Sequence, residues 1–262
     1  MRQLSFYSVD ARPRAVDDLA GLLCGPGQAV RFGRGTSARL SLVVPDRWRV
    51  VALAAECAAR GVVAELSSGT AVVSSSAAVS GPATAKGSAA TKGSATVKGT
   101  AAAKGTAAVS GMAATKGTAA ANGSGSASGE DPGSGGHPAE GWPLLRTAFR
   151  ADLAALAAAW TRGAVKAVPA GFVPDGPVLR LWAQAAGRCD GGGYLLGLDP
   201  HAPDTHEPLV SALAKAGITA VLLGPRGGGP ALRITGRRRL ARLVELVGAA
   251  PAGAPPQAWP AD

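Results

Sequence analysis

The chain contains one segment twice, and this internal repeat constrains its fold more than any other feature. Residues 145–156 (LRTAFRADLAAL) align without a gap with residues 232–243 (LRITGRRRLARL), and six of the twelve positions are identical. A composition rich in Ala, Leu and Arg raises the number of chance matches, but the pattern around both segments repeats as well. Such a duplication predicts an architecture of two similar halves.

A low-complexity stretch, residues 69–140, interrupts the first half. Its hexads have the form Ala-x-x-Lys-Gly-Ser/Thr and place lysines in register at Lys86, Lys92, Lys98, Lys104 and Lys116. Large apolar side chains are nearly absent, so burial would not offset an ordering cost of ~1–2 kcal/mol per residue. A left-handed β-helix needs an inward aliphatic residue in every unit, and only two valines qualify. We therefore expect a disordered insertion, which is either filler or a flexible cationic tether.

Charge and cysteine usage limit the classes of protein to consider. The formal net charge of +10 favours a polyanionic partner. Cys24, Cys57 and Cys189 are too few and too far apart for a disulfide framework or a zinc site, so we expect a reducing, cytoplasmic compartment. No apolar run suits an export signal or a membrane span, which excludes a membrane partner at this stage.

Apolar periodicity and turn residues predict a regular order of elements outside the insertion. Helices are expected at residues 13–24, 47–60, 150–166, 204–216 and 237–247. Strands are expected at residues 29–32, 38–44, 62–66, 142–149, 177–183, 194–199, 218–223 and 231–235. Each half then reads αββαββ, and the helix at 150–166 both completes the first half and begins the second. The insertion falls where a hairpin turn would be, a place where long loops cost little stability.

The sequence of the first helix resembles a known motif. Residues 19–27 (LAGLLCGPG) match the LAGLIDADG motif at five positions, and the motif opens a unit in the αββαββ order of that superfamily. The corresponding segment of the second half is Thr161–Pro169. Within the superfamily, residues 160–164 (WTRGA) are similar to the non-catalytic domain of the actinobacterial sporulation regulator WhiA. The resemblance implies an α+β fold of two degenerate LAGLIDADG-like halves related by a pseudo-two-fold axis.

The resemblance also shows what this chain lacks. Homing endonucleases of the superfamily carry acids at the sixth and eighth motif positions, which place carboxylates at the central helix pair, and the later acid binds the divalent metal used for phosphodiester cleavage. Cys24 and Pro26 occupy these positions in the first helix, and Lys166 and Val168 occupy them in the second. Without carboxylates a hard cation has no ligands, so we expect no metal, no cofactor and no catalysis. The WhiA proteins continue into a helix-turn-helix domain, whereas this chain continues into a Pro/Ala tail at 251–262.

Arginines at alternate strand positions form the candidate binding surface. Because successive residues of a strand face opposite sides, a charged residue between two apolar neighbours points away from the core. Five arginines fit this pattern: Arg31, Arg39, Arg146, Arg180 and Arg233. In LAGLIDADG-like proteins the corresponding sheet surface lies in the DNA major groove, where Arg pairs with phosphates or guanine. Alternatively, each Arg is an ordinary solvated strand residue, or pairs with an acid such as Glu65 or Asp199.

Other basic positions are weaker candidates. Arg237 and Arg238 begin the last helix, where positive charge opposes the helix dipole by about 0.3–1 kcal/mol, so either a phosphate partner or a solvated face explains them. Lys166, which stands where the family has an acid, completes the candidate set. The Gly-rich run at 224–229 lacks the ending of a P-loop and is read as a hairpin turn. His201 and His206 are read as a helix cap and exposed residues, and Trp160 and Trp182 as core.

The sequence thus predicts a first LAGLIDADG-like half at 1–68, completed by a last strand at 141–149, and a second half at 150–250. The favoured function is non-catalytic binding of duplex DNA by a basic sheet, in a bacterial transcription or sporulation-related regulator. The alternative is a structural or interaction module that meets an acidic protein or a second copy of the chain. An active homing endonuclease is the third possibility considered.

Overall fold

The computed structural model describes residues 9, 12–68, 142–225 and 228–261, and it shows a mixed α+β protein with antiparallel sheets. The lysine hexads lie outside the described residues. The first part contains α1 (Ala20–Cys24), β1 (Gln28–Phe32), β2 (Ser37–Val43), α2 (Arg47–Ala58), β3 (Ala64–Ser68), β4 (Pro143–Thr147) and α3 (Ala154–Ala159). Two short 3-10 turns accompany them, η1 (Val16–Leu19) before α1 and η2 (Gly33–Gly35) between β1 and β2.

The second part follows a small hairpin of β5 (Thr161–Arg162) and β6 (Val165–Lys166). It contains α4 (Gly176–Ala186), β7 (Gly187–Asp190), β8 (Gly193–Gly197), α5 (His206–Lys215), β9 (Val221–Leu223), β10 (Ala231–Thr235) and α6 (Arg237–Val247). The 3-10 turns η3 (Pro203–Thr205) and η4 (Pro256–Ala258) lie before α5 and near the end of the chain.

The two four-stranded sheets share one connectivity. Their orders are β1-β2-β4-β3 and β7-β8-β10-β9, all antiparallel. A helix precedes each sheet (α1 or α4), a second one joins its second and third strands in the sequence (α2 or α5), and a third follows its last strand (α3 or α6). The repeated segments at 145–156 and 232–243 therefore begin on matching strands, β4 and β10.

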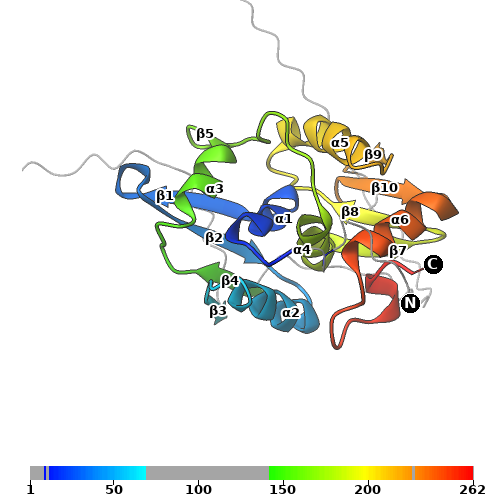
Figure 1. Cartoon of the computed structure of the whole chain (residues 1–262), viewed down its shortest axis with the longest axis horizontal. Helices are drawn as coiled ribbons and strands as arrows, with labels where there is room; N and C mark the ends of the chain where they lie inside the picture. The colour runs from blue at the N-terminus through cyan, green and yellow to red at the C-terminus, as the bar shows by residue number, and fades with distance from the viewer. Residues whose placement is uncertain (1–8, 10–11, 69–141, 226–227, 262) are drawn as a thin grey trace, which may run out of the picture. The chain divides into compact units, whose positions relative to one another are not determined.

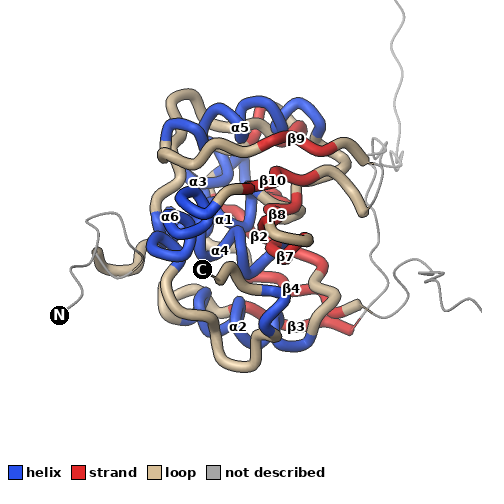
Figure 2. Tube along the Cα trace, turned by 90° about the vertical axis from the view of Figure 1, so that its right-hand side faces the viewer, coloured by secondary structure: helices blue, strands red, loops and turns tan. Residues whose placement is uncertain are grey.

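Helices and strands occupy separate layers. Figure 2 shows the helices on one side of the chain trace and the strands on the other. On the first sheet, Leu40 and Leu42 of β2 and Leu145 of β4 are buried beneath this helical layer, as are Leu196 of β8 and Leu232 of β10 on the second. No described element covers the opposite side of either sheet, which we call the open face.

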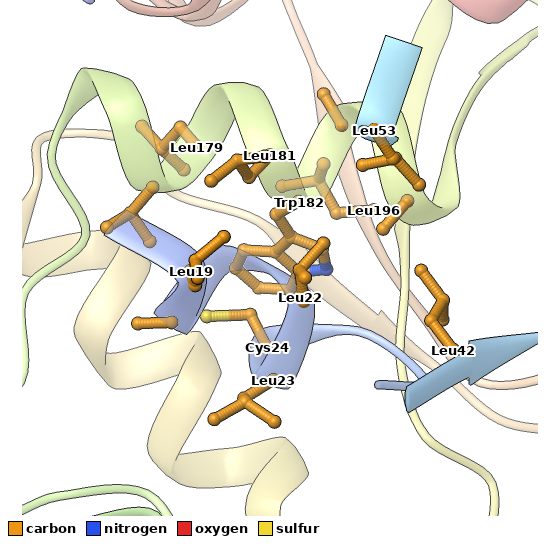
Figure 3. Packing of buried hydrophobic residues seen from close by; sticks show 14 of the residues in the cluster. Leu19, Leu22, Leu23, Cys24, Leu42, Leu53, Leu179, Leu181, Trp182 and Leu196 are labelled. Atoms are coloured by element: carbon orange, nitrogen blue, oxygen red, sulfur yellow. The ribbon is translucent and has the colours of Figure 1, made fainter. Parts of the chain in front are cut away.

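Helices α1 and α4 pack together at the centre of the described fold (Figure 1). Gly21 makes this approach possible, because a Cβ there would lie 2.2 Å from the carbonyl oxygen of Val178 and 2.7 Å from Cβ of Leu181. Figure 3 shows the apolar side chains of α1 and α4, including Leu22 and Trp182, packed around this contact. Trp160 and Trp182 are both buried, as expected from the sequence. Each fully buried Leu contributes roughly 1.5–3 kcal/mol.

The segment at 177–183 is not a strand, as the sequence predicted, but most of helix α4. The Asp175 carboxylate accepts a hydrogen bond from the Val178 amide at 3.1 Å, which caps the helix, and Pro177 lies in its first turn. Asp followed by Gly and Pro is a helix-start signal, and the apolar alternation of the run that follows concealed it. Strand β7 follows α4 directly and was not predicted, because the preceding run was itself predicted as the strand of that hairpin.

The helix predicted at 150–166 is also wrong in its second part. Helix α3 is short and Trp160 caps its end, after which residues 161–166 form the β5–β6 hairpin. Gly163 lies in the hairpin turn with φ of +64°, a backbone conformation that residues with an L side chain rarely adopt. The segment Thr161–Pro169 therefore does not form the second motif helix, and the helix that packs against α1 is α4.

The position predicted for the insertion is confirmed. Strands β3 and β4 are antiparallel neighbours, with Ser68 paired to Pro143, so the intervening segment joins the two ends of a hairpin. The antiparallel pairing of β9 and β10 likewise confirms that the Gly-rich run at 224–229 connects a hairpin, although residues 226 and 227 lie outside the described residues.

Candidate nucleic-acid interface

The open face carries four arginines, two on each sheet. Strand register decides the faces, because paired residues of antiparallel strands point to the same side. Arg39 pairs with Val30 and Arg146 pairs with Ser41, whereas their neighbours Leu40 and Leu145 are buried on the helical side. On the second sheet, Arg188 and Arg233 both pair with Leu195 of β8. The open-face arginines are Arg39, Arg146, Arg188 and Arg233.

Arg39 and Arg146, on the first sheet, lack carboxylate partners among the described residues. Arg146 lies opposite Glu65 in the β3–β4 register, yet their charged groups form no ion pair. The Nε atoms of Arg39 and Arg146 are shielded from water and have no hydrogen-bond partner within the described ranges. A shielded guanidinium N–H without a partner lowers the stability of the fold. Hydrogen bonds within the described fold therefore give no reason for an arginine at either position.

Arg233, the counterpart of Arg146 in the internal repeat, has a different environment. Its Nε lies 3.0 Å from Oδ2 of Asp190, an ion pair whose side chains are 39% and 41% exposed. The pair lacks hydrogen-bond geometry at Nε. An exposed pair of this kind contributes at most about 1 kcal/mol and leaves the guanidinium accessible.

Arg188 is an open-face residue that the sequence reasoning missed, because strand β7 was not predicted. Its side chain is exposed, and its Nη2 lies 3.5 Å from the carbonyl oxygen of Gly228, at the limit of a hydrogen bond. The glycine turn at 191–193 is the sequence signal for strand β7, because a hairpin turn before β8 requires an antiparallel strand on its other side.

Arg31 does not lie on the open face with Arg39. It pairs with Ala38, which is fully buried on the helical side, so the two arginines point to opposite sides of the sheet. Both arginines stand between apolar neighbours in the sequence, which predicted a shared face. This prediction is wrong for Arg31, because Val30 and Phe32 face outward at this edge strand, where they are 43% and 65% exposed.

Arg180 is wrongly placed by the strand prediction and belongs to α4. Its Nε donates to Glu56 Oε1 at 2.8 Å, and its Nη1 donates to the carbonyl oxygens of Val247 and Ala249, both at 2.7 Å. Its guanidinium also lies over the ring of Trp259, 5.3 Å from the centroid. Arg180 thus joins α4 to α2, α6 and the C-terminal segment, and it is not part of a sheet surface.

Lys166 is likewise a buried structural residue. Its Nζ donates to the carbonyl oxygens of Gly25 and Gly27 at 2.6 and 2.8 Å and pairs with Asp199 Oδ2 at 3.1 Å. Burial lowers the pKa of Lys166, and Asp199 partly offsets this effect. The first two contacts hold the turn after α1, and the third joins Lys166 to the segment after β8, so the buried side chain has no access to a polyanion.

A line of ion pairs runs through the helical side, which we call the central charge network: Arg12, Asp18, Arg60, Glu56 and Arg180. Asp18 and Arg60 are fully buried and 2.9 Å apart. Burial alone would raise the pKa of Glu56, but hydrogen bonds from Arg180 and Arg60 outweigh it and hold that pKa below its usual value. The cations of this network are therefore committed to the fold.

Arg49 of α2 has a similar structural role. Its guanidinium donates to the carbonyl oxygens of Ala183, Gln184 and Gly187 at the end of α4 and pairs with Asp46. A cation at a helix C-terminus satisfies free carbonyls and complements the dipole. Asp46 occupies the cap position of α2, but its side chain accepts a hydrogen bond from Arg49 and caps no backbone amide.

Arg237 and Arg238 lie in the first turn of α6 and are exposed, as the sequence predicted for that helix. No carboxylate within the described ranges pairs with either of them. They follow Thr235, the last residue of β10, and so continue the positive charge of Arg233 beyond the end of the strand.

The end of α1 carries no free carboxylate. Cys24 is 1% exposed, and burial raises the pKa of its thiol far above the usual range. Asp199, which follows β8 and bonds Lys166 beside the turn after α1, is also buried and accepts hydrogen bonds from Lys166, Gln28 and the His201 amide. No three His, Cys, Asp or Glu side chains gather for a metal in the part of the chain that the structure describes.

Helix length gives one further result. Among the described residues, none of the helices has the length and apolar character needed to cross a membrane.

Comparison with known proteins gives no family assignment. No family model matches the chain, and a search of curated proteins finds no significant relative.

Proposed function

We propose that the chain is a degenerate LAGLIDADG-like protein in which α1 and α4 form the central helix pair. The close approach at Gly21, within the motif-like segment at 19–27, supports this arrangement. The shared strand order of the two sheets, each opened by one helix of the pair, supports it further. The second helix of the proposed pair is thus Gly176–Ala186, which replaces the segment that the sequence suggested.

We further propose that the open face binds duplex DNA in the major groove without cutting it. The observation that carries this proposal is the contrast in partners between the central charge network and the two open-face arginines of the first sheet. Arg60 and Arg180 on the helical side are held by carboxylates, whereas Arg39 and Arg146 on the open face have none in the described residues. Phosphates or guanine edges would accept hydrogen bonds from the Nη atoms of these two guanidinium groups.

We propose that the chain does not cleave DNA, because the ends of the two central helices lack acidic residues. Cys24 and Pro26 stand where the endonucleases of the superfamily have their acids, and α4 ends in Ala185 and Ala186. Asp199 lies nearby but is neutralised by Lys166. A Mg²⁺-dependent nick in plasmid DNA would contradict this part of the proposal.

The cellular role follows only from the resemblance to WhiA. We propose a cytoplasmic bacterial regulator, actinobacterial in type and active in transcription or sporulation. The two sheets would supply the DNA contact, since nothing in the described residues resembles a helix-turn-helix pair.

Removing charge from the open face tests the DNA proposal. The triple variant R39A/R146A/R233A should bind duplex DNA far more weakly, and the slope of log affinity against log salt should fall by about 2.7 if each Arg contacts one phosphate. The matched control R47A/R162A/K215A removes three charges from exposed positions on α2, β5 and α5. Gel shift over a range of salt measures both variants.

The alternative function gives different results in the same experiment. If the two triple variants lose affinity equally, only net charge matters and the open face is not the binding surface. If the wild type binds no duplex at low salt, the DNA proposal fails, and binding to an acidic protein or a second copy becomes the leading function. Sedimentation of the wild type would then distinguish self-association from a separate partner.

A further inference from the structure

An aromatic cluster lies at one end of the open face of the first sheet. Phe32 ends β1 and is 65% exposed, and Phe149 follows β4 and is 41% exposed. Their ring centroids are 5.2 Å apart with the planes inclined by 43°. Val30, also exposed, lies two residues before Phe32 on the same face. Together these three side chains form an apolar patch, which we call the aromatic cluster.

The cluster is held rigidly and is joined to the basic surface. Arg39 places its guanidinium 4.7 Å from the centroid of the Phe149 ring. Although Phe149 lies beyond β4, two backbone hydrogen bonds between Ala38 and Arg150, of 2.9 and 2.8 Å, join the next residue to β2. These contacts place the rings beside Arg39 on the surface of the sheet.

The second sheet has no such cluster. Val221 is the one large apolar side chain of its open face, among the described residues, that is strongly exposed, and no aromatic ring accompanies it. Exposed apolar side chains in contact with one another indicate a binding surface more strongly than isolated ones. The two halves of the open face thus differ in chemistry, although Arg146 and Arg233 lie on matching strands.

We infer that the aromatic cluster contacts thymine methyl groups, so that the first sheet recognises a thymine-containing part of the DNA site. This inference rests on the proposed function, because it requires the open face to lie in the major groove. There, the C5-methyl of thymine is the apolar group that base pairs present to a protein. The two inclined rings share no flat surface on which an unpaired base would stack, whereas a methyl group fits against their exposed edges.

The position of Arg39 beside the aromatic cluster indicates which DNA groups its guanidinium would contact. Since Arg39 stacks on Phe149, a methyl bound at the cluster lies close to a guanidinium that can reach a phosphate or a guanine edge. The first sheet would then favour thymine-containing DNA, whereas the second sheet, with Arg188 and Arg233 and no rings, would bind with less dependence on sequence.

Removal of the methyl from DNA tests the inference directly. The wild-type full chain is titrated with an alternating dA·dT duplex and with its dA·dU counterpart, which differs by the C5-methyl. We expect weaker binding of the dA·dU duplex by roughly 4-fold for each contacted methyl, which corresponds to about 0.8 kcal/mol of apolar burial. The double variant F32A/F149A should bind both duplexes equally, which separates the methyl contact from any change in groove shape.

Control measurements separate a failure of the methyl contact from a failure of DNA binding. V51A, which truncates a 62% exposed valine on α2 of the helical side, should keep the wild-type preference for dA·dT. Equal, salt-dependent binding of both duplexes by the wild type would overturn the methyl contact and leave the DNA proposal intact. Full preference in F32A/F149A, with unchanged thermal unfolding, would overturn it as well. If neither duplex binds, the proposed function itself is wrong.

Discussion

The helical side and the open face use the same residue type in opposite ways. Arg60 of the helical side is fully buried between Asp18 and Glu56, while Arg39 and Arg146 of the open face have no carboxylate partner within the described ranges. A buried guanidinium without a partner would be strongly destabilising, so its partners are part of the fold. Arginines in this chain therefore either stabilise the fold through ion pairs or remain available on the surface, and the contacts of each arginine show which role it has.

The largest test of this difference concerns the helix contact on the buried side. Gly21→Ala should lower the free energy of unfolding by about 3 kcal/mol or more, because the new Cβ would overlap backbone atoms of Val178 and Trp182. Gly224→Ala is the matched control, since a Cβ there meets no atom within 4 Å. Denaturant unfolding measures both. Equal stability of the two variants would show that α1 and α4 are not in close contact.

The second test breaks the central charge network. Asp18→Asn removes the charge that Arg60 and Arg12 share, and we expect a loss of about 3 kcal/mol, since Glu56 still pairs with Arg60. Asp152→Asn is the control, because the Arg150–Asp152 pair is exposed to solvent and contributes little to stability. A small loss for Asp18→Asn would mean that water reaches Arg60.

The third test is the pH dependence of stability. The folded pKa of Glu56 lies below its unfolded value, so its contribution is present above the unfolded pKa and is lost as pH falls through the folded pKa. Stability should therefore fall in acid, below about pH 4. Glu56→Gln should be less stable near neutral pH and flatter over the acid range. Glu207→Gln, on the exposed side of α5, should keep the wild-type curve in thermal melts.

The smallest effect on stability is expected on the open face. Arg39→Ala and Arg146→Ala should each change the free energy of unfolding by less than about 0.5 kcal/mol, because neither side chain holds a carboxylate in the described fold. Arg180→Ala, which removes contacts to α2 and α6, should cost several times more. If the open-face variants unfolded as readily as Arg180→Ala, the contrast between the two sides would be lost.

Local signals in the sequence were enough for most elements. The helix at Arg237–Val247 and the strand at Ala231–Thr235 have the predicted bounds, and the hairpin position of the insertion is correct. These elements have clear apolar periods bounded by glycines, and such patterns act over a few residues. The α+β class followed from them. The segment from 150 to 190 was misread, because an Ala-rich helix, a short hairpin and a helix of alternating apolar residues carry conflicting periods.

The tertiary structure alone decided which basic residues are free. Alternation along a strand gives two faces but not which of them is covered, and so Arg31 was grouped with Arg39 although Ala38 fixes it on the helical side. Arg180 and Lys166 look like surface cations in the sequence because their partners, Glu56 and Asp199, are distant in the chain. Burial and pairing depend on contacts between segments far apart, whereas the sequence by itself determined the repeat, the charge and the absence of acids after α1.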